Sequence, residues 1–350
     1  MASVPHINRA DLELVRAIGE GGFGSVFHMT WKRSGTRDLQ HVAAKRLYKV
    51  ESPELDILSE LKHPNVVRLI GVVPDELDFM LVLELCNHGS LRSYLDRHDK
   101  HPLPTELFEK WSREAAKAIR YLHQMGIIHK DVKSQNYFIS GENVLKLGDF
   151  GLAEKMVMKK APPVAETGTS VEGASQIPIT TINTSQMVVK ASIPETGISV
   201  AAALQTSTTT TPRGSWTHMA PELQHTTCKL SPKFDIFSFG VVLWEMLTGQ
   251  VPYESMSYQA IISHVCRKNR RLEIPRECPR HLADLMVRCW QGNQEMRPDI
   301  DQVMRVLGKK TTMKTMQEKE VDVHRLETMM GSIGMNDHAY SSFLSKFMFY

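Results

Sequence analysis

A glycine-rich stretch near the N-terminus is the first segment with the composition of a ligand-binding site. The pattern GxGxxG alone fits a plain tight turn or a dinucleotide-binding turn about equally well, but the dinucleotide turn needs a helix directly after the glycines. Here residues 26–31 are rich in β-branched and aromatic side chains, so we expect the glycines to join two strands. In such a hairpin the missing side chains let backbone amides approach phosphate oxygens. The glycines are Gly19, Gly21, Gly22 and Gly24.

A lysine and a glutamate follow that are suited to a buried ion pair. Lys45 ends a short apolar strand, and nine residues later Glu54 lies on a predicted helix that Ser52 can cap and Pro53 can start. Helical spacing places Glu54 on the same face as the apolar residues of this helix. A carboxylate on that face needs a cation, and Lys45 is the available one.

Two later polar segments carry residue types for acid–base and metal chemistry. Asp131 is followed at intervals of two and three residues by Lys133 and Asn136, a spacing that a plain polar loop would not predict. Asp149 begins an Asp-Phe-Gly tripeptide after the apolar run 144–147, and alone this tripeptide arises by chance in many proteins. The four segments in this order make coincidence negligible.

Hydrophobic periodicity indicates the elements that must position these residues. From Leu12 to about residue 82, short apolar runs broken by glycines and polar residues predict strands, with one helix near 53–61. From Thr105 apolar residues recur at three-to-four spacing, as they do again around 241–246 and 282–290. We therefore predict an α+β protein, with a small strand-rich lobe followed by a larger helical lobe.

Two segments depart from this organisation. Residues 161–212 contain no aromatic residue and are crowded with Ser and Thr, so we predict a disordered insert. In the tail 309–350, Met316, Val323 and Met330 fall seven apart. This spacing predicts a short amphipathic helix, which could mediate a homodimer.

Composition excludes several classes of protein. At ~150 residues per domain the 350 residues amount to roughly two domains. The net charge of +3 does not favour a nucleic-acid or membrane-surface binder. The five scattered cysteines contain no CxxC pair, which argues against a disulfide framework or a zinc site. Neither a signal peptide nor an apolar run of ~20 residues is present, so we expect a cytoplasmic protein.

The motifs together resemble those of protein kinases over nearly all of Leu12–Gly308. The resemblance implies the bilobal protein kinase fold, with an N-lobe at about 12–85 and a C-lobe at about 90–308 after an N-terminal flank of 1–11. Further residues match the family, which suggests that Glu222 pairs with Arg297 and that Asp235 anchors the loop of Asp131.

The resemblance also implies ATP-dependent transfer of a phosphoryl group, which needs positioning and charge stabilisation. Lys45, oriented by Glu54, would hold the α- and β-phosphates of ATP. Asp131 would accept the proton of the substrate hydroxyl, and Lys133 would neutralise the developing charge. Mg²⁺ would be bound by oxygen atoms of Asn136 and Asp149.

The same family pattern implies an adenine pocket. Adenine would lie between Val26 and Ala43 on one side and Phe138 on the other. Its edge would meet the backbone from Glu84 to Cys86, and Leu83 would gate the pocket behind it.

Finer features suggest a subgroup. Lys133 fits the serine/threonine-specific pattern DxKxxN, since tyrosine-specific members usually carry Arg and Ala there. Residues 240–248 resemble the tyrosine-kinase-like group. The short interval from Lys45 to Glu54 is most similar to mixed-lineage and zipper- and sterile-alpha-motif-containing MAP kinase kinase kinases. The implied substrate is a protein with a Ser/Thr acceptor, such as a MAP kinase kinase.

Three residues depart from the family pattern. Lys130 replaces an arginine and loses its bidentate fork, Phe138 is bulkier than the usual aliphatic floor, and His218 stands where Tyr or Trp is common. The insert is either a tolerated expansion or a segment ordered by autophosphorylation, among Thr206–Thr211 or at Ser215 and Thr217, and by pairing of the phosphates with Lys130 or other cations. The competing function is a pseudokinase or scaffold, which loss of Lys45, Asp131 or Asp149 would have favoured; none is lost.

Overall fold

The computed structural model describes residues 4–21, 24–33, 38–47, 53–75, 78–156, 215–224 and 228–309. All of these belong to one compact unit made of residues 1–157 and 212–350. The predicted insert 161–212, the predicted tail helix and the predicted cap Ser52 lie outside the described residues.

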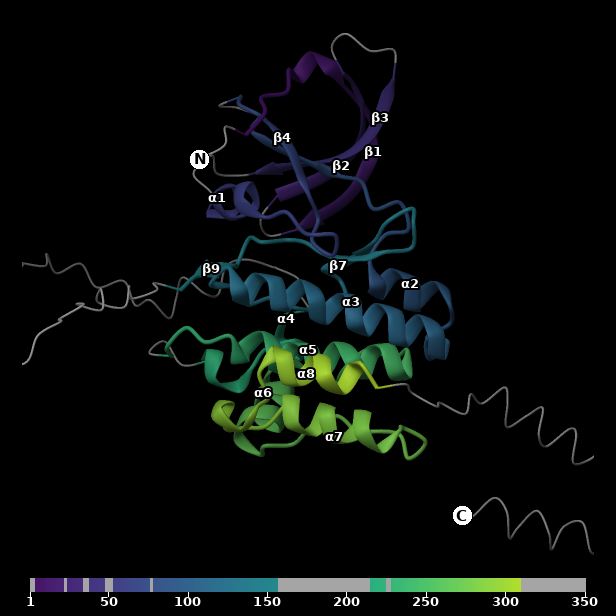
Figure 1. The fold of residues 1–350 in the computed structure, drawn as a ribbon, viewed down its shortest axis with the longest axis vertical. Coiled ribbons are helices and arrows are strands. Elements are labelled where there is room, and N and C mark those ends of the chain that lie inside the picture. The colour runs from purple at the N-terminus through teal and green to yellow at the C-terminus, as the bar shows by residue number, and fades with distance from the viewer. Residues whose placement is uncertain are drawn as a thin grey trace, which may run out of the picture. The chain divides into compact units, whose positions relative to one another are not determined.

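The N-terminal part is a five-stranded sheet with one helix, α1 (Pro53–Glu60) (Figure 1). Neighbouring strands are antiparallel in the order β1-β2-β3-β5-β4, and one face of the sheet packs an apolar cluster around Met29, Val42 and Val82. The predicted strands and helix are therefore confirmed. The strands are β1 (Leu12–Gly21), β2 (Gly24–Lys32), β3 (Leu39–Leu47), β4 (Leu69–Val73) and β5 (Met80–Glu84).

The rest of the described chain is mostly helical, and it contains the helices predicted after Thr105 (Figure 1). In α5 every residue from Phe234 to Thr248 is buried, because α3, α4 and α7 all pack against this helix. This arrangement confirms the α+β, bilobal kinase fold. The helices are α2 (Leu91–Arg97), α3 (Thr105–Gln124), α4 (Ser215–His218), α5 (Lys233–Thr248), α6 (Tyr258–Ile262), α7 (Arg280–Cys289) and α8 (Ile300–Leu307).

Short elements complete this part of the fold. Two two-stranded sheets pair β6 with β9 and β7 with β8. They carry the loops in which Asp131 and Asp149 lie. The elements are β6 (Ile127–Ile128), β7 (Tyr137–Ile139), β8 (Leu145–Leu147), β9 (Glu154–Lys155), the 3₁₀ helices Arg9–Asp11, Pro221–Gln224 and Gln294–Met296, and the π-helix Ser263–Arg267.

The residues before Leu12 add to the edge of the sheet. Ile7 donates its backbone N–H to the carbonyl of Val72 at 2.8 Å, and Val72 donates to the carbonyl of Pro5 at 2.9 Å. Gly71 permits this approach, since a Cβ there would lie 2.6 Å from the Pro5 oxygen. The segment thus covers the edge of β4 and places Ile7, 4% exposed, in the apolar cluster.

Replacing Ile7 by alanine is expected to destabilise the fold by about 2–4 kcal/mol, because it removes buried methyl groups and leaves a cavity. Urea denaturation measures the effect. Leu14→Ala is the matched control, since Leu14 is 60% exposed on β1 and its loss should cost less than about 1 kcal/mol. Equal losses in the two variants would contradict a structural role for the N-terminal segment.

Candidate active site

Lys45 lies at the centre of a cluster of charged side chains. Its Nζ is 2.8 and 2.9 Å from the two carboxylate oxygens of Glu54 and 2.7 Å from Oδ1 of Asp149. The side chains of Lys45 and Glu54 are 8% and 2% exposed. β3 and α1 therefore bring together the predicted ion pair, and the loop after β8 adds a second carboxylate.

The pKa values of this cluster follow from burial and pairing. Burial opposes the charge on Lys45, but Asp149 and Glu54 outweigh it and raise the pKa of the amine. Burial raises the pKa of Glu54 even though Lys45 opposes the shift. Burial also acts to raise the pKa of Asp149, but the ammonium of Lys45 outweighs it, and the net shift is downward. Lys45 and Asp149 are therefore charged at neutral pH.

The loop between β6 and β7 holds Asp131, Lys133 and Asn136 together. Lys133 Nζ lies 2.6 Å from Asp131 Oδ2, and the side-chain amide of Asn136 donates to the backbone oxygen and Oδ2 of Asp131 at 2.8 and 3.0 Å. The backbone oxygen of Asn136 accepts a hydrogen bond from the backbone N–H of Gly148, the residue directly before Asp149. The loop thereby joins the predicted acid–base residue to both predicted metal ligands.

Asp235, at the start of α5, is hydrogen-bonded to the backbone of the loop that carries Asp131. Its carboxylate accepts hydrogen bonds from the backbone N–H groups of His129 and Lys130 at 3.0 and 2.9 Å, and His123 Nε2 lies 2.9 Å away. Burial acts to raise the pKa of Asp235, but the hydrogen bond from His123 and its other contacts lower it overall. Because Lys130 has a φ of 65°, these bonds also hold a left-handed backbone. The anchoring role implied for Asp235 is present.

Three of the predicted adenine-binding residues, Val26, Ala43 and Leu83, share one face of the sheet with Lys45. Val26 pairs with Lys45 across β2 and β3, and Ala43 pairs with Leu83 across β3 and β5. Directly opposite residues in an antiparallel pair share a face, so these four side chains lie on the same side. Gly22 and its neighbour Phe23 lie outside the described residues.

The structure describes the surroundings of three further predicted pocket residues, Glu84, Cys86 and Phe138. The carboxylate of Glu84 accepts hydrogen bonds from the Arg68 N–H and from Lys146, and its backbone N–H donates to the Arg68 carbonyl at 3.0 Å. Burial raises the pKa of the Cys86 thiol to about 12, so this cysteine is not a thiolate at neutral pH. On β7, Phe138 packs so closely on Gly148 that a Cβ there would lie 3.1 Å from the ring.

One exposed apolar residue next to the predicted glycine-rich turn was not among the predicted site residues: Ile18, which directly precedes the first glycine. Ile18 is 40% exposed, and a shift in strand register falls between Ala17 and Gly19. Simple alternation along β1 does not reveal such an irregularity. The signal that could have found it is an apolar residue next to a glycine-rich turn.

Comparison with known proteins identifies the family. Residues 12–179 and 182–307 match the family described as protein tyrosine and serine/threonine kinase. This chain belongs to the protein kinase family.

Curated relatives of this kinase support the assignment at about 30% identity. The mitogen-activated protein kinase kinase kinase dlk-1 of Caenorhabditis briggsae is 30% identical over 289 residues, covering 82% of this chain and 27% of the relative. Mitogen-activated protein kinase kinase kinase 12 of Rattus norvegicus is 29% identical over 301 residues, covering 86% of this chain and 27% of the relative. Ephrin type-A receptor 7 of Gallus gallus is 30% identical over 308 residues, covering 85% of this chain and 26% of the relative. This kinase thus spans about a quarter of the length of these relatives.

A second feature implied by the kinase resemblance is also present. Arg297, fully buried, donates to both carboxylate oxygens of Glu222 at 2.6 and 2.8 Å, and its guanidinium lies 5.0 Å from the centre of the Phe237 ring. The implied Glu222–Arg297 pair is therefore confirmed, and it fixes the segment after α4 to the C-terminal part of the kinase.

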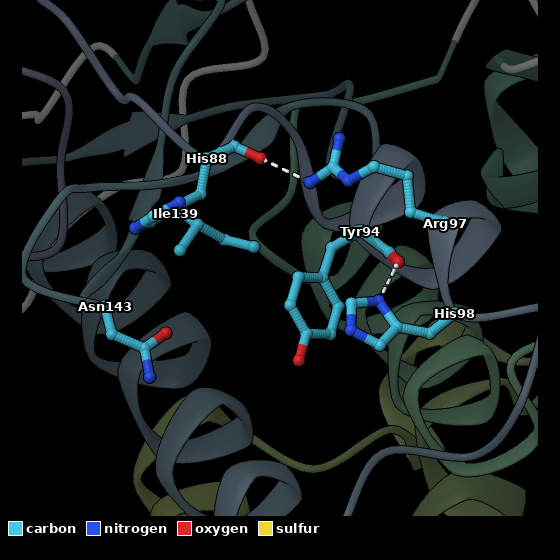
Figure 2. Close-up of a pocket in the computed structure, with 6 residues that line it drawn as sticks. All are labelled: His88, Tyr94, Arg97, His98, Ile139 and Asn143. Atoms are coloured by element: carbon cyan, nitrogen blue, oxygen red, sulfur yellow. Dashed lines mark hydrogen bonds between the residues drawn. The ribbon is translucent and has the colours of Figure 1, made fainter.

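The kinase also has a surface pocket of about 460 Å³ beside α2 and the β7–β8 hairpin (Figure 2). Tyr94 and His98 lie face to face in it, and the side chain of Arg97 donates to the His88 carbonyl at 2.7 Å. None of the predicted catalytic residues lines this pocket. Its lining residues are His88, Tyr94, Arg97, His98, Ile139 and Asn143.

Among the residues that the structure describes, no helix is long and apolar enough to span a membrane.

Proposed function

We propose that this kinase is an ATP-dependent protein serine/threonine kinase of the MAP-kinase-kinase-kinase type. It would transfer the γ-phosphate of ATP to a Ser or Thr of a protein substrate such as a MAP kinase kinase. The cluster of Lys45, Glu54 and Asp149, with contacts of 2.7–2.9 Å, carries this proposal. A pseudokinase would not need to keep the lysine, the acid–base residue and the metal ligand in place together.

The residues present fit ATP and Mg²⁺. Lys45 keeps its charge and would bind the α- and β-phosphates, with Glu54 holding the ammonium in place. Asp149 and Asn136 offer the oxygen donors that suit a hard cation, and Asn136 directs its amide nitrogen to Asp131, which leaves its side-chain oxygen for another partner. When bound, Mg²⁺ would neutralise charge on the phosphates.

Asp131 and Lys133 would act on the acceptor and the transferred group. Asp131 is nearly buried, and its Oδ2 is held by Lys133 and Asn136. That carboxylate would accept the proton of the substrate hydroxyl, and the ammonium 2.6 Å away would neutralise charge on the phosphoryl group. Lys133 favours Ser/Thr over Tyr as the acceptor, by the DxKxxN pattern described above.

The proposed kinase domain spans 12–308. Two of the relatives are named as MAP kinase kinase kinases, and a third is named as an ephrin receptor. The proposal of a MAP kinase kinase substrate therefore rests on the first two names together with Lys133 and the short interval between Lys45 and Glu54.

The test is incubation of the chain with labelled ATP, Mg²⁺ and dephosphorylated casein, beside Asp131→Asn. The wild type is expected to label serine and threonine, and the variant to transfer at least about 10²-fold more slowly, because asparagine cannot accept the proton. Phosphoamino-acid analysis separates Ser/Thr from Tyr. Equal labelling by the two proteins, or none by the wild type, would contradict the proposal.

A further inference from the structure

The surface pocket beside α2 and the β7–β8 hairpin contains none of the residues that the proposed function uses (Figure 2). Its volume of about 460 Å³ lies within the range of pockets that hold small organic molecules, about 300–1,000 Å³. Its lining comes from the stretch before α2, from α2 with its C-cap, and from the β7–β8 hairpin. The pocket is therefore a candidate site for a ligand other than ATP.

The charge of the lining favours an anion. Arg97 is permanently charged, and the imidazoles of His88 and His98 each add a positive charge when they are protonated. Among the described residues, no acidic side chain lines the pocket. Asp96, which precedes Arg97, is paired with Arg92 at 3.0 Å, so its charge is compensated outside the pocket. An anionic ligand would thus meet positive groups and no carboxylate.

Arg97 supplies the permanent charge in a fixed position. One of its terminal nitrogens donates to the backbone oxygen of His88 at 2.7 Å, which holds the guanidinium at the pocket. This bond uses one donor, and a guanidinium has several more. Its planar fork matches two oxygens of one phosphate group, a geometry that a lysine ammonium does not offer.

His98 is held with one ring nitrogen toward its own helix. Nδ1 lies 2.8 Å from the Tyr94 carbonyl, and because a carbonyl only accepts, Nδ1 carries a hydrogen. The ring also stacks on the Tyr94 ring, with 4.1 Å between the two centres, which holds it in place. Nε2 is therefore the nitrogen that faces a ligand, and it becomes a donor when the ring is protonated.

The β7–β8 hairpin adds an apolar wall and a neutral donor. Figure 2 shows Ile139 and Asn143 across the pocket from the stacked rings of Tyr94 and His98. The backbone oxygen of Asn143 accepts hydrogen bonds from the side chains of Lys110 and Trp111, so the side-chain amide is the part of Asn143 that can serve a ligand. The lining thus suits a molecule with an organic part beside its anionic group.

We propose that this pocket binds a small organic molecule that bears a phosphate group. Arg97 would bind two phosphate oxygens, with Nε2 of His98 and the amide of Asn143 as further donors. The organic part would occupy the space beside Ile139 and Tyr94. Because the predicted catalytic residues lie elsewhere, the inference does not rest on the proposed function.

The experiment is calorimetric titration of the full chain with phenyl phosphate, in the presence of Mg²⁺ and adenylyl imidodiphosphate so that a phosphate probe does not occupy the ATP site. We expect a Kd below about 1 mM for phenyl phosphate and no measurable binding of phenol, its neutral counterpart. A separate titration with adenylyl imidodiphosphate alone reports on the proposed ATP site, so failure of the two proposals can be told apart.

Variants of Arg97 assign the binding to this pocket. Arg97→Gln is expected to weaken phenyl phosphate about tenfold, because the charge and the fork are both lost. Arg97→Lys should recover only part of the affinity, since an ammonium keeps the charge without the fork. The matched control is Arg280→Gln, whose side chain is 96% exposed on α7 and whose loss should leave the affinity unchanged.

Asn143→Gly is an independent second variant. Asn143 has a φ of 59°, a conformation that glycine adopts readily, so the change removes the amide and keeps the backbone. It should weaken phenyl phosphate about threefold.

Four outcomes would overturn the inference. These are no binding of phenyl phosphate by the wild type, equal binding of phenol, an unchanged affinity in Arg97→Gln, and a phosphoserine peptide that binds more than about tenfold tighter than phenyl phosphate. The last result would assign the pocket to a protein segment in place of a small molecule.

Discussion

Lys45→Met is expected to lower phosphoryl transfer by about 10²–10³-fold, because it removes a preorganised positive group from the phosphate site. It should also destabilise the fold by about 3–5 kcal/mol, since loss of one partner leaves a buried charge uncompensated. That charge is Glu54, whose side chain is 2% exposed. Label transfer to casein measures the first effect and urea denaturation the second.

Two control variants separate the effect of losing a charge in the phosphate site from the effect of leaving Glu54 without Lys45. Lys155→Met removes an ion pair of similar length, 2.6 Å to Glu60, but those side chains are 43% and 38% exposed, so the cost should stay below about 1 kcal/mol. The double variant Lys45→Met with Glu54→Gln removes the stranded charge and should recover much of the stability without recovering activity. Recovery of both, or equal costs for Lys45→Met and Lys155→Met, would contradict this account.

The stability deficit of Lys45→Met should shrink as the pH falls. Burial already raises the pKa of Glu54, and loss of Lys45 would raise it further. A carboxyl with a raised pKa in the folded state destabilises the fold at higher pH, and this cost disappears as the pH falls through its folded pKa. Denaturation of both proteins at several pH values below neutral tests the sign, and a deficit that grows on acidification would refute it.

Asp235→Asn is expected to cost about 3 kcal/mol of stability, because a buried unsatisfied donor costs about 1–3 kcal/mol and hydrogen bonds to a charged group contribute about 1.5–3 kcal/mol. The two carboxylate oxygens of Asp235 accept hydrogen bonds from the backbone N–H groups of His129 and Lys130, and an asparagine side chain would keep only one acceptor oxygen. The left-handed backbone at Lys130 would lose part of its support, so transfer should fall as well. Urea denaturation and label transfer measure the two effects.

Asp284→Asn is the matched control. Its partner Arg280 lies 4.0 Å away, and the two side chains are 69% and 96% exposed, so the change should cost less than about 0.5 kcal/mol. An equally small cost for Asp235→Asn would show that the catalytic loop does not depend on this carboxylate.

The pH dependence of Asp235→Asn has a defined sign. Because the folded pKa of Asp235 is lowered, its charge contributes stability that is fully present above the ordinary aspartate pKa of about 4. This contribution is lost as the pH falls through the folded pKa. The difference between wild type and variant should therefore be largest near neutral pH and decrease in acid.

Local patterns in the sequence were sufficient for several features. Helical spacing placed Glu54 on the buried face of α1, and the need of a buried carboxylate for a cation predicted the pair with Lys45 that the structure contains. The β-rich residues after the glycines predicted the strand pairing of β1 with β2. These predictions succeeded because a repeat of two or 3.6 residues determines which side chains share a face.

The sequence by itself determined the kinase family, the strand-rich and helical parts, and the residue types of the site. The tertiary structure alone decided that Lys45 contacts Asp149, 104 residues away, that Ile7 covers β4, and that His218 meets Ser134 through Glu245. Periodicity shows that a side chain is buried but does not identify its partner. The partner depends on how distant elements pack, and a single sequence does not record that arrangement.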